Sequence, residues 1–180
     1  MADRGLTGIL LVGGASSRFG SPKALARFEG ETLAERAWSL LGEVCAETIA
    51  VGRSDGLPFP ALGDEGTGPV AAIAAGLRKA THEVAVVVPV DMPLLTAGAL
   101  RLLAAACREA AVAQAGPLPC AVARRTLPAF ETGERRLRTV LDGLDTAHVE
   151  LEDRLLANVN EPEDLRTIAA SEDFEPRGEA

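Results

Sequence analysis

Aromatic residues and clusters of positive charge are both scarce in this sequence of 180 residues. Tyrosine is absent, Trp38 is the one tryptophan, and aromatic residues make up 3% of the chain. Proteins that bind single-stranded nucleic acid stack bases on aromatic side chains, so the composition argues against that class. The formal net charge is −8 and no block is rich in lysine and arginine. A long nucleic-acid footprint needs positive charge against many phosphates, so we expect no nucleic-acid partner.

Cysteines are few, and long hydrophobic runs are missing. Cys45, Cys107 and Cys120 are odd in number and lack CxxC or histidine-linked spacing, which disfavours a disulfide framework and a structural zinc site. We predict that they are small buried apolar residues in a reducing compartment, and we expect a cytoplasmic location. The apolar stretch Ile9–Val12 ends at Gly13 and is too short for a secretion signal or a membrane span. We therefore expect no membrane partner.

Glycine and apolar residues, by contrast, are plentiful. The chain has 18 glycines, and 47% of its residues are hydrophobic. That is enough apolar surface for a core, so global disorder is excluded. The length is that of one domain, and we predict a single domain over residues 1–170 with a flexible polar tail over residues 171–180.

Short apolar runs and amphipathic segments alternate along the chain. Runs rich in β-branched residues predict strands, the strongest being Val84–Val90. The others are Thr7–Val12, Glu47–Gly52, Cys120–Ala123 and Ala147–Leu151. Helices are predicted over Thr32–Val44, Pro69–Ala80 and Glu161–Ala170, and a fourth helix, capped by Thr96, is predicted to extend to Ala111. At the start of the last helix, Asn160 and Glu163 resemble a capping box. Because parallel strands need crossover helices, this order predicts a three-layer α/β/α sandwich with a mainly parallel, Rossmann-like sheet.

In such sheets, ligands bind beyond the carboxyl ends of the strands, and a glycine-rich loop follows the first strand. Gly13 and Gly14 allow backbone N–H groups to face an anion, and Arg18 and Lys23 add positive charge. These are the ingredients of a phosphate-binding loop, although a glycine-rich turn with two solvated cations is the alternative. The segment has neither P-loop nor GxGxxG spacing.

A lone carboxylate, Asp91, follows the strongest predicted strand and lies between Pro89 and Pro93. Beside a phosphate loop, Asp91 is suited to bind Mg²⁺, which takes oxygen ligands from one or two carboxylates and from substrate phosphates. The alternative is a solvated residue at the end of the strand, or one that caps a helix.

Two further segments contain candidate polar residues. Asp64 lies just before a predicted helix, where composition alone favours a flexible connector. Asn158 and Asn160 stand two positions apart, so in an extended segment their side chains point to the same side. Asn160 also has the simpler interpretation of a helix cap.

Taken in their order along the chain, these four segments resemble those of the nucleotidyltransferases that include molybdenum cofactor guanylyltransferase and the related cytidylyltransferases. The first segment fits the family pattern LxGGxSxRxGxxK at every position from Leu11 to Lys23. The family's other three motifs are similar to the stretch around GTGPVAAI, to VPVDMPLL and to NVNEPEDL. Residues 133–137 also look like the G-x-R-x-L helix start of such enzymes. The resemblance extends from about Thr7 to Leu165.

The resemblance implies a fold like that of nucleotide-diphospho-sugar transferases and Mg²⁺-dependent transfer of GMP from GTP to a molybdopterin-type molybdenum cofactor. Arg18, Lys23 and Asp91 would be catalytic, Asp91 would bind the metal, and Asn158 and Asn160 would lie near the metal and the acceptor. The nucleotide would be bound by Leu11, Val12, Gly13, Gly14, Lys23, Asp64 and Asp91. Among these, Asp64 would bind the guanine base, because a carboxylate can accept its ring N–H and exocyclic amino hydrogens. GTP and the cofactor are then the expected partners of a monomer that makes at most transient contact with proteins that deliver or receive the cofactor.

Two departures from the family pattern leave alternatives open. Gly52 stands where guanylyltransferases commonly have asparagine, and the stretch between Asp91 and Asn158 is short. A cytidylyltransferase or another small-metabolite nucleotidyltransferase is therefore the nearest alternative, and a non-catalytic nucleotide-binding subunit is an alternative from another class. A receiver-like signalling domain would need acids after its first strand, where this chain has glycines and cations.

Overall fold

The computed structural model describes residues 5–13, 22–53, 55–63 and 68–170. The expected tail over residues 171–180 lies outside this part of the chain. The described residues form a seven-stranded sheet in the order β5-β4-β1-β6-β8-β7-β9. In chain order its strands are β1 (Leu6–Leu11), β4 (Glu47–Val51), β5 (Ala61–Leu62), β6 (Val84–Pro89), β7 (Ala110–Ala113), β8 (Cys120–Ala123) and β9 (Thr146–Val149). Each strand pair is parallel except those that β8 makes with β6 and β7, so the expected mainly parallel sheet is confirmed.

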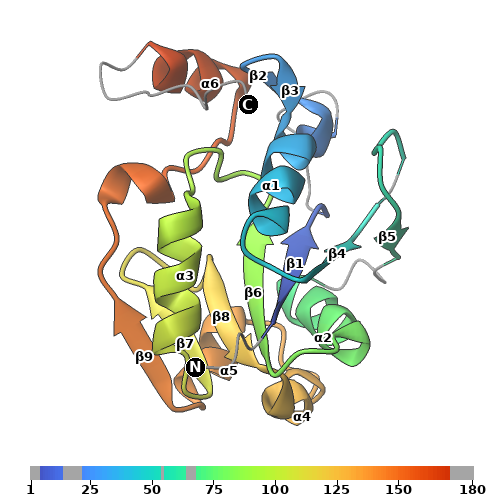
Figure 1. Cartoon of the computed structure of the whole chain (residues 1–180), viewed down its shortest axis with the longest axis vertical. Coiled ribbons are helices and arrows are strands. Elements are labelled where there is room, and N and C mark those ends of the chain that lie inside the picture. Colours follow the sequence, from blue (N-terminus) through green and yellow to red (C-terminus); the bar gives the residue numbers. More distant parts are fainter. Residues whose placement is uncertain (1–4, 14–21, 54, 64–67, 171–180) are drawn as a thin grey trace.

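Helices cover both faces of this sheet (Figure 1). The helices α1 (Leu33–Gly42) and α3 (Ala97–Ala106) pack on one face, and α2 (Pro69–Lys79), α4 (Leu127–Phe130) and α5 (Leu137–Asp142) pack on the other. Successive residues of the central strand β6 therefore alternate between two buried layers, with Val86 and Val88 in one and Val87 in the other. A strand that is buried on both faces has a continuous run of apolar residues in its sequence, which is why the segment of β6 was the strongest predicted strand. The three-layer α/β/α sandwich is confirmed.

The helix expected to extend to Ala111 is shorter than predicted. α3 ends at Ala106, and the following Cys107 has an extended backbone. Residues Ala110–Ala113 instead form β7, which is buried at every position and pairs with β8 and β9. An alanine-rich run favours a helix by its intrinsic propensity, but here pairing and burial between two strands decide the structure.

The last helix, α6 (Pro162–Ala169), begins one residue later than the predicted capping box requires. Its N-cap is Glu161, and the reciprocal hydrogen bonds of the box join Glu161 and Asp164, so the assignment to Asn160 and Glu163 is wrong. Pro162 occupies the first helical position, where its missing N–H is not needed, and this fixes the cap at the residue before it.

A small hairpin that the sequence analysis did not predict lies over the start of α1 (Figure 1). It pairs β2 (Arg27–Phe28) with β3 (Glu31–Thr32), and Glu29 and Gly30 both have positive φ in its two-residue turn. Three 3₁₀ helices complete the described elements: η1 (Lys23–Leu25), η2 (Arg124–Thr126) and η3 (Asp153–Leu156). Within the described ranges, none of the helices has both the length and the apolarity needed to cross a membrane.

Candidate active site

The carboxyl ends of three central strands meet at one edge of the sheet. Leu11, at the end of β1, is in register with Val51 of β4 on one side and with Pro89 of β6 on the other. The strands stay together just past their ends, because Val12 N–H donates to the Val51 carbonyl at 3.0 Å and Val90 N–H donates to the Leu11 carbonyl at 3.2 Å. The residues that follow these strands are therefore neighbours.

Gly13 and Gly52 bring two of these strand ends into close backbone contact. Gly52 has φ of +133°, and a Cβ at this position would lie 2.5 Å from the Gly13 nitrogen. No side chain fits there unless the backbone moves. The backbone at Gly13 thus occupies the space that a side chain at position 52 would need.

Lys23 and Asp91, 68 positions apart, form an ion pair at this edge. Lys23 Nζ donates to Asp91 Oδ2 at 3.2 Å, and the two side chains are 17% and 27% exposed. η1 provides the lysine and the loop after β6 provides the carboxylate. The structure thus brings together two of the three residues predicted to be catalytic, while their catalytic roles stay predictions.

The segment with the two asparagines lies against the Asp91 loop. Val159 is fully buried between the exposed residues Asn158 and Asn160, and its N–H donates to the Asp91 carbonyl at 2.8 Å. Asp164 accepts the N–H groups of Asn160 and Glu161 at 2.7 and 2.9 Å. These backbone hydrogen bonds, together with the positive charge of Lys23, hold the pKa of Asp164 below its usual value. The fold therefore holds the start of α6 close to both members of the ion pair.

The other predicted site residues, which include the predicted catalytic Arg18, divide into two groups. Leu11 and Val12 are buried at the end of β1, and Gly13 is exposed beyond them. Gly14, Arg18 and Asp64 lie outside the described residues.

The donor set at this edge suits a metal that is shared with a ligand. Among the described residues, no group of three or more histidines, cysteines, aspartates or glutamates could hold an ion by itself. Asp91 offers the carboxylate oxygens that Mg²⁺ prefers, and Mg²⁺ is commonly held by one or two carboxylates plus substrate phosphates. Asp91 therefore fits a Mg²⁺ ion that binds together with a nucleotide.

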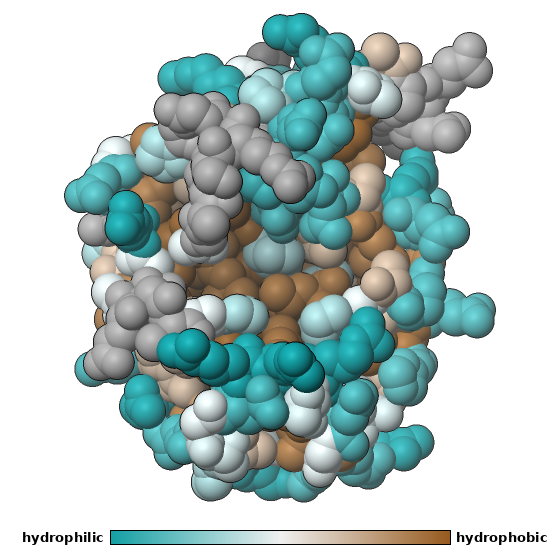
Figure 2. Space-filling model, turned by 180° about the vertical axis from the view of Figure 1, so that it is seen from behind, coloured by the Kyte–Doolittle hydropathy of each residue, from teal (hydrophilic) through white to brown (hydrophobic). Residues whose placement is uncertain are grey.

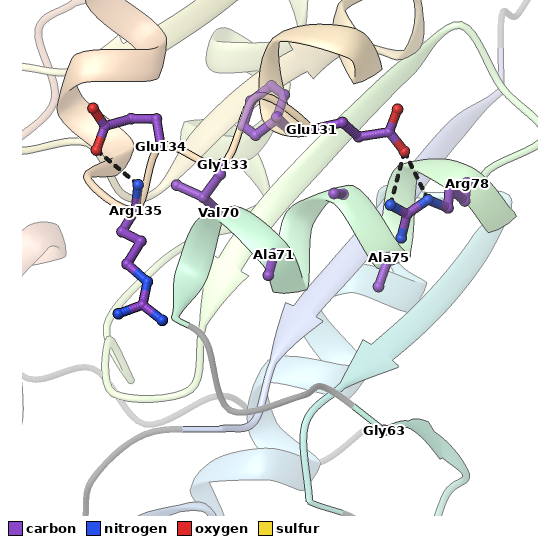
Figure 3. A pocket seen from close by; sticks show the side chains of 11 residues that line it. Gly63, Val70, Ala71, Ala75, Arg78, Glu131, Gly133, Glu134 and Arg135 are labelled. Carbon is purple, nitrogen blue, oxygen red and sulfur yellow. Dashed lines mark hydrogen bonds and ion pairs between the residues drawn. The ribbon is translucent and has the colours of Figure 1, made fainter.

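The surface also has a hollow and a pocket. The face seen in Figure 2 is hollowed near its middle, and the floor of the hollow is hydrophobic. A pocket of about 410 Å³ lies between α2 and the segment from Phe130 to Arg135, and Figure 3 shows the side chains that line it. Its lining includes Arg78 and Glu131, which pair at 2.7 Å, and Glu134, which accepts the backbone N–H groups of the next two residues at 2.7 Å. This last turn leads into α5, so the helix start predicted at residues 133–137 is confirmed.

Sequence reasoning missed Arg36, on α1. It is 5% exposed and is the one buried charged residue among those the structure describes. Arg36 Nε donates to the Pro93 carbonyl at 2.8 Å, and Arg36 Nη1 pairs with Glu31 Oε1 at 3.0 Å. A lone arginine in an amphipathic helix is typical of a solvent-facing position. Its place three residues after buried Leu33 was the available signal that it faces inward.

Comparison with protein families gives a match over most of the chain. The model of the family described as "MobA-like NTP transferase domain" matches residues 8–152. A probable molybdenum cofactor guanylyltransferase from Chloroflexus aggregans is 31% identical, over 92% of this chain and 94% of that protein. A molybdenum cofactor guanylyltransferase from Pseudomonas putida is also 31% identical, over 88% of this chain and 94% of that protein.

Solved structures share the fold. A nucleotidyl transferase from Methanothermobacter thermautotroptrophicus superposes with a TM-score of 0.77 at 19% identity, over 91% of this chain and 95% of that one. The molybdopterin-guanine dinucleotide biosynthesis protein A from Archaeoglobus fulgidus gives 0.74 at 24% identity, over 89% and 95% of the two chains. A 2-C-methyl-D-erythritol 4-phosphate cytidylyltransferase from Thermus thermophilus gives 0.66 at 20% identity, over 88% and 95%.

Proposed function

Because the chain belongs to the family of MobA-like NTP transferase domains and is a nucleotidyltransferase, we propose that it transfers GMP from GTP to a molybdopterin-type molybdenum cofactor. The reaction requires Mg²⁺ and releases pyrophosphate. The relatives named molybdenum cofactor guanylyltransferase support the choice of substrates. The observation that carries the proposal is the Lys23–Asp91 pair, where the end of β6 meets the segment that follows the glycine-rich loop.

The proposed chemistry is an in-line displacement at phosphorus. An oxygen of the acceptor's terminal phosphate forms a bond to the α-phosphorus of GTP, and the bond between the α-phosphorus and pyrophosphate breaks. A phosphate monoester is already ionised near neutral pH, its second pKa being about 6, so no residue has to act as a general base. The work left to the protein is alignment of the two phosphates and neutralisation of charge.

Each residue of the site has a part in that work. The backbone N–H groups at Gly13 and Gly14 bind the triphosphate, and Arg18 and Lys23 offset the charge that develops on the leaving pyrophosphate. Asp91 holds Mg²⁺, which when bound supplies positive charge to the phosphoryl oxygens. Asp64 accepts hydrogen bonds from the guanine base, and Asn158 and Asn160 face the molybdenum cofactor that accepts the GMP.

The cysteines support a mechanism without a covalent thiol intermediate. Burial raises the pKa of Cys45 and of Cys107 to about 11, and burial also raises that of Cys120, so all three stay protonated near neutral pH. Cys120 is buried as predicted, whereas Cys45 and Cys107 are only half-buried. All three are free, and we place the reaction in the cytoplasm.

The test is attachment of a labelled nucleotide. The protein is incubated with Mg²⁺, molybdopterin cofactor and each of the four NTPs in turn, and the product is identified by mass spectrometry together with released pyrophosphate. We expect GMP attachment with GTP, and at least about a 100-fold slower reaction in Asp91→Asn, the range seen when one stabilising group is removed from an active site. Asp145→Asn, at an exposed ion pair with Arg108, is the matched control. Unchanged turnover in Asp91→Asn would remove Asp91 from the mechanism.

Gly52 favours a second candidate, a cytidylyltransferase. In the family pattern that the sequence resembles, an asparagine at this position would contact the base through its side chain, and Gly52 has none. The fold does not separate the two candidates, because it is shared both with the Archaeoglobus fulgidus protein and with the Thermus thermophilus cytidylyltransferase. The same incubation separates the two, because a cytidylyltransferase attaches CMP from CTP and leaves GTP unused. Nucleotide binding without any attachment would instead favour a non-catalytic subunit.

A further inference from the structure

We propose that Arg36 is a positioning residue that sets the geometry of the Lys23–Asp91 pair. Its effect on catalysis rests on the proposed function, whereas its effect on the pair itself does not. The inference begins from an unusual location, since charged side chains are almost never fully buried unless they are paired. Arg36 belongs to the core-facing side of α1 and does not touch Asp91 in any described contact, so it would act through the segments it binds.

One end of the arginine holds the loop that carries Asp91. Arg36 Nε donates to the carbonyl of Pro93, which stands two residues after Asp91, at 2.8 Å within the buried interior. A buried carbonyl without a partner is costly, and a charged donor gives a stronger hydrogen bond than a neutral one. The direction in which the chain leaves Asp91 is therefore fixed from α1.

The other end of the arginine holds the hairpin that follows Lys23. Arg36 Nη1 pairs with Glu31 of β3 at 3.0 Å, and the guanidinium carbon lies 5.2 Å from the ring centre of Phe28 in β2. Phe28 is 3% exposed, and the Leu33 N–H donates to the carbonyl of Ala26, three residues after Lys23, at 2.9 Å. The hairpin and η1 are thus held against the start of α1.

A planar guanidinium suits this double attachment better than any other side chain. Its nitrogens diverge in a fixed plane, so Nε can bond Pro93 while Nη1 bonds Glu31 and the face of the group lies near Phe28. A lysine carries one nitrogen and cannot span both acceptors in the same way. The two segments that provide the ion pair are in this manner tied to one rigid group.

Lysine chemistry gives a direct test, because Lys23 and Lys79 are the two lysines of the chain. Brief treatment with acetic anhydride, followed by mass spectrometry, measures the acetylation rate of each Nζ in the same sample. An amine held against Asp91 and largely buried reacts slowly, whereas one that swings into solvent reacts faster. Lys79, at the exposed end of α2, is the internal standard.

Arg36→Met keeps a long apolar side chain over Phe28 but breaks both polar attachments. We expect the Lys23-to-Lys79 rate ratio to rise at least about five-fold, toward the ratio in Asp91→Asn, where the pair itself is lost. Arg101→Met, which removes an exposed arginine bonded to the Glu43 carbonyl, should leave the ratio unchanged. An unchanged ratio in a folded Arg36→Met protein overturns the inference.

Arg36→Lys keeps the test decisive if the methionine variant does not fold. It retains the charge but reaches only one of the two acceptors, so we expect an intermediate ratio, and a wild-type ratio would contradict the double attachment. In turnover with GTP, the loss should fall on kcat, by about 10- to 100-fold, with a smaller change in KM. If the wild-type protein does not attach GMP, the proposed function fails, whereas the acetylation ratio still decides the role of Arg36.

Discussion

At the scale of single residues, Gly52 makes a prediction about stability. Gly52→Ala places a Cβ 2.5 Å from the Gly13 nitrogen at a φ of +133°. Strain of this kind costs on the order of 1–3 kcal/mol before the clash is added, so we expect a loss of at least about 2 kcal/mol in the free energy of unfolding. Urea unfolding, followed by circular dichroism, measures this loss as a lower midpoint at constant slope.

Gly30→Ala is the matched control for this prediction. Gly30 also has a positive φ, +87°, but a Cβ there meets nothing within 4 Å. The alanine at position 30 therefore carries the backbone strain alone and should cost less than the alanine at position 52. Equal losses at the two positions would mean that the close approach of the Gly13 backbone contributes nothing to stability.

At the scale of elements, the start of α6 fixes the segment with the two asparagines. Asp164→Ala removes the acceptor for the N–H groups of Asn160 and Glu161, so we expect faster hydrogen exchange at both amides by about ten-fold or more, as one lost cap implies. Glu163→Ala, which loses only an exposed pair with Arg166, should leave both rates nearly unchanged. Equal effects of the two variants would contradict the capping role of Asp164.

The same carboxylate gives α6 a pH dependence. The pKa of Asp164 is lowered in the folded protein, chiefly by the N–H groups of Asn160 and Glu161, so its contribution is fully present above the unfolded pKa of about 4. The contribution is lost as the pH falls through the lower folded value. The difference in exchange between wild type and Asp164→Ala should therefore close only below about pH 4. A difference that closes while the pH is still well above 4 would mean that the charge of Asp164 is not what protects these amides.

How far elements could be predicted from sequence depended on how long they are and how they are buried. β6 and α2 were predicted to within one residue, because an apolar run and a helix that begins with proline leave few alternatives. β7 was missed because the pairing that makes Ala110–Ala113 a strand comes from distant segments. The β2–β3 hairpin was missed because each of its strands has two residues, too short for any periodicity.

In the candidate site too, some residues could be predicted from the sequence pattern, whereas others depend on packing between distant segments. Lys23 and Asp91 were predicted to belong to one site because ligands bind beyond the carboxyl ends of the strands, which is a property of the fold class. Arg36 was not foreseen, because its bonds to Pro93 and Glu31 depend on how α1 packs over the hairpin. Sequence thus indicates which residues bear the chemistry more readily than which ones hold them in place.

At the scale of the whole molecule, nucleotide binding should appear as a gain in stability. The net charge of −8 does not favour a triphosphate, so binding depends on local positive charge and on Mg²⁺. A nucleotide at 100 times its Kd adds about 2.7 kcal/mol to the free energy of unfolding. For a domain of this size that corresponds to a rise in Tm of about 5–11 °C. We expect this rise with GTP and Mg²⁺, measured by scanning fluorimetry.

The matched measurements use CTP with Mg²⁺, GTP without the metal, and Asp91→Asn with GTP and Mg²⁺. Each should give a smaller rise, because the first changes the base and the other two remove the metal or its protein ligand. A rise with CTP and none with GTP would make the guanine assignment wrong while leaving the nucleotidyltransferase assignment intact. A full rise in Asp91→Asn would show that the nucleotide binds without the carboxylate, so that Asp91 would have to act after binding or not at all.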